Sequence, residues 1–374
     1  MDMSLLRLLY RKEKALLDGS KASLQQAADL TEDLECRLDR RARLFSERGP
    51  SAAYSPERLI LLLTHACQLR CSYCRVSKFS DNMSSSTLRR GIELLMTSRR
   101  PSVQLQFFGG DPLLKFDLIQ EAVELVSELR AKEPRSVRYM LTTNGHALDG
   151  RKLAFFRRHN FLLEFSFDGD YETFSAQRPG VGGRDFYETI KAHLGNLSGS
   201  GIPYYVIAVT TPQSVGRLLE NVRAIAGLGH RRIQINYQLG CFWPDEKIRE
   251  LLIQMGGIAS FSSRTKSFEF INRTVIRREP TVLNSELVVD TDGGIYRETG
   301  ICLEEDFLRQ KREFFVAPVE TATAMEDYPA SPFDNFLLLS RIYGGRSSQF
   351  RKIILNNISV GYAVDRWVRS EQNA

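Results

Sequence analysis

Three cysteines close together in the sequence offer the clearest chemistry of this chain. Cys67, Cys71 and Cys74 are separated by three and then two residues, directly after an apolar run at 59–63. A loop this short can bring three thiolates to one inorganic centre. With three protein ligands, a 4Fe–4S cluster keeps one iron open to a substrate or cofactor. Zinc is the competing metal, with His65 or a distant cysteine as fourth ligand, and three buried cysteines without metal are the remaining alternative.

Short apolar runs alternate with amphipathic stretches from residue 58 onward, and these elements must position the cysteine loop. The runs predict six strands, at 59–63, 103–108, 137–142, 161–167, 204–209 and 233–237. Amphipathic spacing predicts helices near 87–96, 116–129, 151–158, 186–194 and 215–226. Strands that alternate with helices form right-handed βαβ units and a parallel sheet. The predicted fold class is therefore α/β, a (βα)6 partial TIM barrel.

The segments on either side of this barrel predict two extensions. Leucines spaced three and four apart among charges indicate helix over residues 1–48. Beyond residue 240, the runs 287–290 and 294–296 flank an Asp-Gly pair and predict a hairpin. The predicted domains are a helical extension at 1–56, the barrel at 57–240, and a small α+β extension at 241–374.

Glycines and small polar residues end the second, third and fourth predicted strands, at the sheet edge where α/β proteins bind ligands. At Gly109 and Gly110, before Asp111, the missing side chains let the backbone approach a ligand closely. Each of these segments alone would be an ordinary turn. The small polar residues that end the third and fourth strands are Asn144, Ser166 and Asp168.

The cysteine run and these strand ends together resemble the radical S-adenosylmethionine (SAM) superfamily over residues 58–240. The family signature is a three-cysteine run of this spacing after the first strand of a partial barrel. An aromatic residue usually stands before the last cysteine, which is the place of Tyr73. The resemblance implies a 4Fe–4S cluster held by Cys67, Cys71 and Cys74, with SAM bound at the open iron.

The resemblance also implies roles for the strand-end residues. The segment Gly109-Gly110-Asp111 matches the family's Gly-Gly-Glu-Pro segment, which holds the amino group of SAM, with aspartate in place of glutamate. Ser166 falls in the SAM ribose or carboxylate region, with Asp168 beside it and Asn144 as a further candidate. Arg178, in a glycine-rich loop, matches an arginine that grips the SAM carboxylate in the peptide-modifying branch.

That branch includes anaerobic sulfatase-maturing enzymes and ribosomal-peptide maturases. The resemblance implies reductive cleavage of SAM to a 5′-deoxyadenosyl radical, which abstracts hydrogen from a peptide or protein side chain. It also implies a one-electron donor of the flavodoxin or ferredoxin type. The alternatives are a radical SAM enzyme acting on a small metabolite or nucleic acid, and a non-catalytic or zinc-bound interaction module.

The C-terminal third departs from the closest families of this branch. Many members carry a SPASM extension whose cysteines bind auxiliary clusters, but only Cys241 and Cys302 follow Cys74 here. The predicted hairpin at 287–296 is similar to the SPASM hairpin without the cysteine expected after it. We therefore expect a SPASM-like or twitch-like scaffold without cluster ligands. Cys241 either packs at the barrel mouth or donates hydrogen to a product radical.

The composition is that of a folded soluble protein of 374 residues, with 51 basic and 45 acidic residues and a net charge of +6. The basic residues are dispersed, which argues against nucleic acid as a partner. The chain has no run of 18 apolar residues and no signal-like apolar core at its start, so a membrane partner is not expected. We expect a cytoplasmic protein whose cysteines are thiols or ligands.

Overall fold

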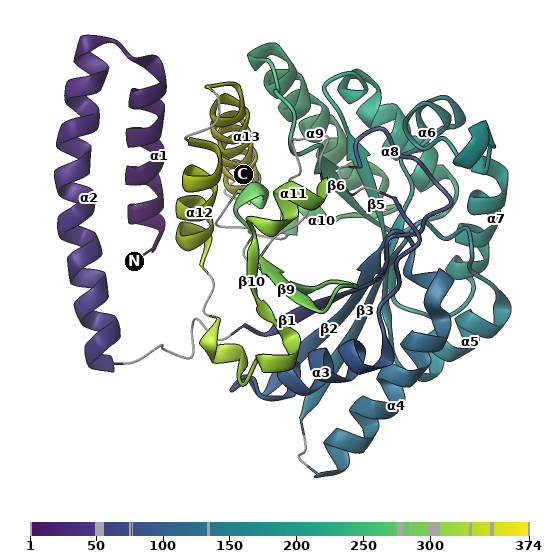
Figure 1. Ribbon diagram of the computed structural model, residues 1–374. Helices are drawn as coiled ribbons and strands as arrows, with labels where there is room; N and C mark the ends of the chain where they lie inside the picture. The colour runs from purple at the N-terminus through teal and green to yellow at the C-terminus, as the bar shows by residue number, and fades with distance from the viewer. Residues whose placement is uncertain are drawn as a thin grey trace.

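The computed structural model describes residues 2–48, 56–74, 76, 78–132, 135–274, 280–284, 286–297, 307–328, 331–344 and 348–372; Cys302 lies outside these ranges. All six predicted barrel strands are present, and each pairs in parallel with the next (Figure 1). The predicted α/β partial barrel is thereby confirmed. The strands are β1 (Arg58–Thr64), β2 (Ser102–Gly109), β3 (Ser136–Thr143), β4 (Leu162–Ser166), β5 (Tyr204–Thr210) and β6 (Arg232–Tyr237).

Helices connect these strands and lie along the outside of the sheet (Figure 1). Side-chain caps explain where three of them begin: Ser84, Asp149 and Asp170 each accept a hydrogen bond from the backbone N–H three residues later. Five helices lie where the sequence predicts them, and α6 (Tyr171–Gln177) is additional. The five are α3 (Ser85–Met96), α4 (Phe116–Lys132), α5 (Gly150–Arg158), α7 (Tyr187–Ser198) and α8 (Leu218–Gly227).

The strands separate an apolar outer layer from a more polar barrel interior. On β2, Leu105 and Phe107 are fully buried in the core beneath the helices. Gln106 points to the other face, because side chains alternate along a strand. Its amide donates to Thr142 at 3.0 Å and to Glu164 at 3.4 Å across the interior. The rim at the carboxyl ends of the strands therefore stands above an interior already filled by side chains.

The sheet continues beyond the six strands at both edges, in the order β10-β9-β8-β1-β2-β3-β4-β5-β6-β7. β7 (Glu269–Phe270) adds to β6, and β8 (Leu287–Val289) pairs in parallel with β1. β8 and β9 (Gly294–Arg297) form the predicted hairpin, which β10 (Phe315–Pro318) extends. The predicted domain boundaries at residues 56 and 240 stay predictions.

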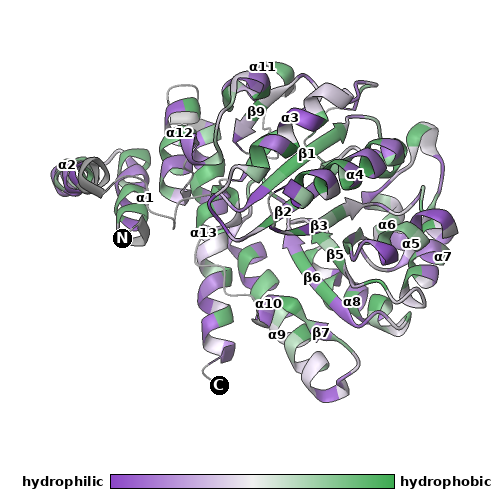
Figure 2. Ribbon diagram, turned by 90° about the horizontal axis from the view of Figure 1, so that it is seen from below, coloured by the Kyte–Doolittle hydropathy of each residue, from purple (hydrophilic) through white to green (hydrophobic). Residues whose placement is uncertain are grey.

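The N-terminal helical stretch consists of two helices rather than one. α1 (Asp2–Asp18) ends at Gly19, whose φ of +71° is left-handed and suits glycine. α2 (Lys21–Arg48) begins after Ser20, whose hydroxyl accepts from the Ser23 N–H. Figures 1 and 2 both place α1 between α2 and α12 (Pro332–Gly344), against which its buried leucines pack.

Long helices also occupy the C-terminal third, where the sequence predicts only a hairpin and a mixed remainder. They are α9 (Asp245–Thr265), α12 and α13 (Ser348–Gln372), with the short α10 (Ile271–Thr274) and α11 (Phe307–Arg312). Two amides on α13 interrupt its apolar pattern. The buried Asn357 bonds the backbone at Gly240 and Cys241, and the partly buried Asn356 bonds that of Trp243. Among the described helices, none combines the length and apolarity needed to cross a membrane.

Candidate active site

The cysteine loop follows β1 and is tied to the last residue of α6 and to the segment after it. The Arg70 N–H donates to the Pro179 carbonyl at 2.7 Å, and the Ser72 N–H donates to that of Gln177 at 2.9 Å. The Cys74 N–H closes a turn on the Cys71 carbonyl at 3.0 Å. Backbone hydrogen bonds therefore hold the loop across the rim of the barrel before any ligand binds.

The three thiols lie near one another but in different surroundings. Cys74 is exposed, whereas Cys67 and Cys71 are partly buried and interact electrostatically with it. The sulfur of Cys67 accepts from the Leu69 N–H at 3.4 Å and from the Asn144 amide at 3.5 Å. Burial raises the pKa of Cys67 and raises that of Cys71 to about 11. Iron binding must therefore displace protons from these thiols.

This burial predicts slow alkylation of Cys71 in the iron-free protein. At about pH 8 and without oxygen, Cys71 should react with iodoacetamide more slowly than the exposed Cys36, because the thiolate is the nucleophile. The rate at Cys71 should continue to rise up to about pH 11. Timed quenching and peptide mass spectrometry measure both rates in one sample. Equal rates at the two cysteines would contradict the prediction.

The end of β2 lies against the cysteine loop so closely that two glycines are required. A Cβ on Gly109 would stand 2.3 Å from the Thr64 carbonyl, and one on Gly110 would stand 2.0 Å from that of Ala66. The Asp111 N–H also donates to the Ala66 carbonyl at 2.9 Å. The Gly-Gly segment thus anchors the loop that carries the cysteines.

Asp111 carries an unsatisfied carboxylate oxygen beneath this loop. Its side chain is fully buried, and Oδ1 accepts from the Thr143 hydroxyl at 2.6 Å. Oδ2 has no hydrogen-bond partner in the described structure, and burial raises the pKa of the carboxyl. Such an oxygen can receive a cationic donor from a ligand.

Asp168 joins two other predicted site residues, Tyr73 and Arg178, in one buried network. Its carboxylate accepts from the Tyr73 hydroxyl at 3.0 Å and pairs with the Arg178 guanidinium at 2.9 Å. The Gln177 amide and the Val209 N–H add bonds of 2.9 and 3.0 Å. Arg178 also lies over the Tyr73 ring, 5.4 Å from its centroid. Protein groups therefore already bind both carboxylate oxygens of Asp168. The predicted contacts of Asp168 and Arg178 with SAM stay predictions.

The two remaining rim residues are placed differently. Asn144 contacts the cysteine loop directly, since its amide nitrogen reaches both Cys67 and the Gln68 side chain, at 3.5 and 3.3 Å. Ser166, at the end of β4, is partly exposed, and its hydroxyl makes no hydrogen bond to the described residues. Asn144 is therefore bound to the loop, whereas Ser166 remains available to a ligand.

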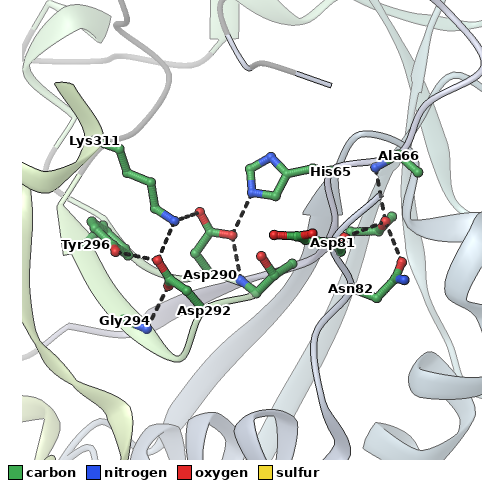
Figure 3. A network of polar contacts seen from close by, with 11 residues as sticks. His65, Ala66, Asp81, Asn82, Asp290, Asp292, Gly294, Tyr296 and Lys311 are labelled. Atoms are coloured by element: carbon green, nitrogen blue, oxygen red, sulfur yellow. Dashed lines mark hydrogen bonds and ion pairs between the residues drawn. The ribbon is translucent and has the colours of Figure 1, made fainter. Parts of the chain in front are cut away.

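A second buried network, which the sequence analysis missed, joins the cysteine loop to the C-terminal hairpin (Figure 3). His65 Nε2 meets Asp290 Oδ1 at 2.8 Å, and Lys311 Nζ pairs with Asp290 at 2.6 Å and Asp292 at 2.8 Å. Burial would raise the pKa of Asp290, but His65 and Lys311 outweigh it and lower that pKa to about 2. His65 was considered above as a zinc ligand, but its Nε2 atom contacts Asp290 instead. The position of His65 next to the cysteines was the only sequence feature that could have pointed to this network.

A cavity of about 250 Å³ opens beside Tyr73, where β6 meets helices from the C-terminal third. Gln234, Asn236 and Gln238 alternate along the chain here and line the same side. Gln234 donates to Asn236 at 3.0 Å, and Gln238 has no side-chain hydrogen bond to the described residues. Amides that can both donate and accept thus face an apolar wall, formed by Leu251, Met255, Val364 and Val368.

These residues fit a 4Fe–4S cluster with SAM on chemical grounds. Three thiols share one anchored loop, and the partnerless Oδ2 of Asp111 lies beside it. Within the described ranges, no three His, Cys, Asp or Glu side chains stand close enough to hold a single metal ion. A cluster takes its thiolates at separate iron atoms.

Comparisons with known proteins agree with a partial-barrel enzyme that carries a metal cluster at its rim. The Radical SAM superfamily model matches residues 61–225. The matched part of the chain contains the cysteine loop, and the radical SAM superfamily implies a 4Fe–4S cluster and SAM as cofactors.

Three similar proteins are peptide-related by name or by what is bound. PqqA peptide cyclase of Gluconobacter oxydans is 29% identical over 203 residues, 53% of each chain. Native anSMEcpe with bound AdoMet and Kp18Cys peptide has a TM-score of 0.67 at 15% identity, covering 85% of this chain and 100% of that one. Streptococcus suis SuiB bound to precursor peptide SuiA has a TM-score of 0.56 at 14% identity, covering 88% and 76%. The chain spans about half the length of the curated relatives it matches.

Proposed function

We propose that this chain is a radical SAM enzyme that abstracts hydrogen from a side chain of a peptide or protein substrate, as in the maturation of ribosomal peptides. The observation that carries the proposal is the loop of three thiols, held at the barrel rim by backbone bonds to β2 and to the segment after α6. The peptide cyclase and the two peptide-bound structures support the choice of a peptide substrate.

Different residues at the rim would bind the cluster and SAM. Cys67, Cys71 and Cys74 would hold the cluster, and Asp111 would accept the amino group of SAM through its partnerless oxygen. Ser166 would contact SAM with its unbonded hydroxyl, and Arg178 would contact the SAM carboxylate. When bound, the reduced cluster and SAM supply a carbon-centred radical that removes hydrogen from an unactivated carbon.

The cavity beside Tyr73 would receive the substrate. Its amide row on β6 can both donate to and accept from peptide groups, so a backbone could exchange its bonds to water for bonds to the protein. The apolar wall from α9 and α13 excludes water from the reacting carbon. The role of this chain is therefore to place a C–H bond and to protect it from competing donors.

Anaerobic reconstitution tests the proposal. We expect roughly four irons and an equal amount of sulfide per chain, an electron paramagnetic resonance signal after dithionite reduction, and release of 5′-deoxyadenosine from SAM. If the chain binds zinc instead of iron, or holds a cluster but does not cleave SAM, the proposed enzymatic activity is wrong. If SAM is cleaved, deuterium transfer from labelled peptides to 5′-deoxyadenosine then tests the substrate class.

A further inference from the structure

An arginine-lined groove lies where the N-terminal helical pair meets the end of α13. It measures about 660 Å³, within the size range of about 300–1,000 Å³ typical of ligand pockets. Three helices contribute, because α1 packs against both α2 and α13. We call this the arginine groove, and its lining residues are Ser4, Arg7, Leu8, Arg11, Asp33, Arg37 and Arg369.

Two of its four arginines carry uncompensated charge. Arg37 pairs with Asp33 at 2.8 Å, and Arg369 pairs with Asp365 at 2.9 Å. Arg7 and Arg11 are exposed and make no ion pair or hydrogen bond with the described residues. They stand one turn apart on α1 and therefore share a face, where like charges repel. A bound anion would relieve this repulsion.

Carboxylates suit this groove better than nucleic acid does. A guanidinium forms paired hydrogen bonds with a carboxylate, and Arg7 and Arg11 offer two guanidinium groups on one face of α1. Among the described residues that line the groove, none is aromatic and able to stack a base. We propose that the arginine groove binds an acidic segment of a peptide or protein partner.

The groove also adjoins the cavity beside Tyr73. Asp365 lines that cavity and forms an ion pair with Arg369, which lines the groove, so one turn of α13 contributes to both. A partner bound by its acidic segment could thus present a second segment to the cavity. This link to the cavity rests on the proposed function, whereas the anion-binding groove does not.

Fluorescence anisotropy with a labelled glutamate–glycine peptide tests the groove in the full chain. Binding should weaken as salt increases, and the double variant Arg7→Gln/Arg11→Gln should bind roughly three- to tenfold more weakly. The matched control Arg157→Gln/Arg158→Gln changes two exposed arginines on α5, on the other side of the molecule (Figure 1), and should bind like the wild type. Circular dichroism should show unchanged melting for both.

Three results would overturn the proposal: equal binding of a lysine–glycine peptide, an equal loss in the control variant, or tighter binding of a single-stranded oligonucleotide that depends on Arg7 and Arg11. Iron content and 5′-deoxyadenosine release are measured on the same samples. If the chain binds the acidic peptide but does not cleave SAM, the groove proposal holds and the proposed enzymatic function is wrong. If it cleaves SAM but does not bind the acidic peptide, the enzymatic function holds and the groove proposal is wrong.

Discussion

Replacing Cys71 with alanine should reduce bound iron from about four atoms per chain to near zero after anaerobic reconstitution. Only two thiolates would remain on the loop, and the described structure places no other cysteine there to replace the third. SAM cleavage should fall by more than about 100-fold, since it depends on the cluster. Iron analysis and chromatography of 5′-deoxyadenosine measure the two losses.

Cys241→Ala is the matched control for this variant. Cys241 is also partly buried, but its thiol follows β6 and contacts the Gln238 carbonyl at 3.7 Å. The control should keep its iron. Loss of iron from this variant, or retention of a full cluster by Cys71→Ala, would show that the ligand set is wrong.

Replacing Lys311 with methionine should destabilise the protein by about 3–5 kcal/mol, because it removes the ammonium group from a buried carboxylate that keeps its contact with His65. Lys311 is 4% exposed and Asp290 is 0% exposed, so water cannot take over the lost interaction. The low pKa of Asp290 means that its carboxylate stabilises the fold above about pH 4 and loses this effect as the pH falls toward 2. Acid unfolding of the variant should therefore begin at a higher pH. Urea and acid titrations followed by circular dichroism measure both effects.

Arg217→Met removes a comparable but exposed pair and serves as the control. Arg217 contacts Asp170 at 2.6 Å and Glu172 at 2.8 Å, with 42% of its side chain exposed. An exposed pair contributes about 0–1 kcal/mol, so this variant should unfold almost like the wild type. Equal destabilisation by the two substitutions would refute a special role for the buried pair.

Local sequence patterns were sufficient to predict the barrel and its cysteine loop. Runs such as 59–63 and 204–209 are apolar, short and followed by amphipathic stretches, so each strand and helix is encoded within a few residues. The thiols are encoded in the same way, since Cys67, Cys71 and Cys74 lie in one loop. Asn144 was predicted at the rim, although its amide bond to the Cys67 sulfur was not.

Contacts between distant segments could not be predicted in this way. His65 and Asp290 are 225 positions apart, and no periodicity indicates that they pair. Arg178 pairs with Asp168, a contact that the sequence analysis did not predict, while the contact with the SAM carboxylate implied by the resemblance stays a prediction. Helix α13 was missed because Asn356 and Asn357 face the barrel loop where a helix normally presents apolar side chains.

The pairing of β8 with β1 has a consequence for synthesis on the ribosome. β1 is made of apolar residues between Arg58 and Thr64, and its free edge is covered only when Leu287–Val289 arrive. Until then, the nascent barrel exposes unpaired backbone N–H and C=O groups along β1, to which a strand of another chain can pair. A chain that stops before residue 287 should therefore aggregate, even though its cysteine loop and all six barrel strands have been translated. Solubility during expression thus depends on a segment that is distant in sequence from the cysteine loop.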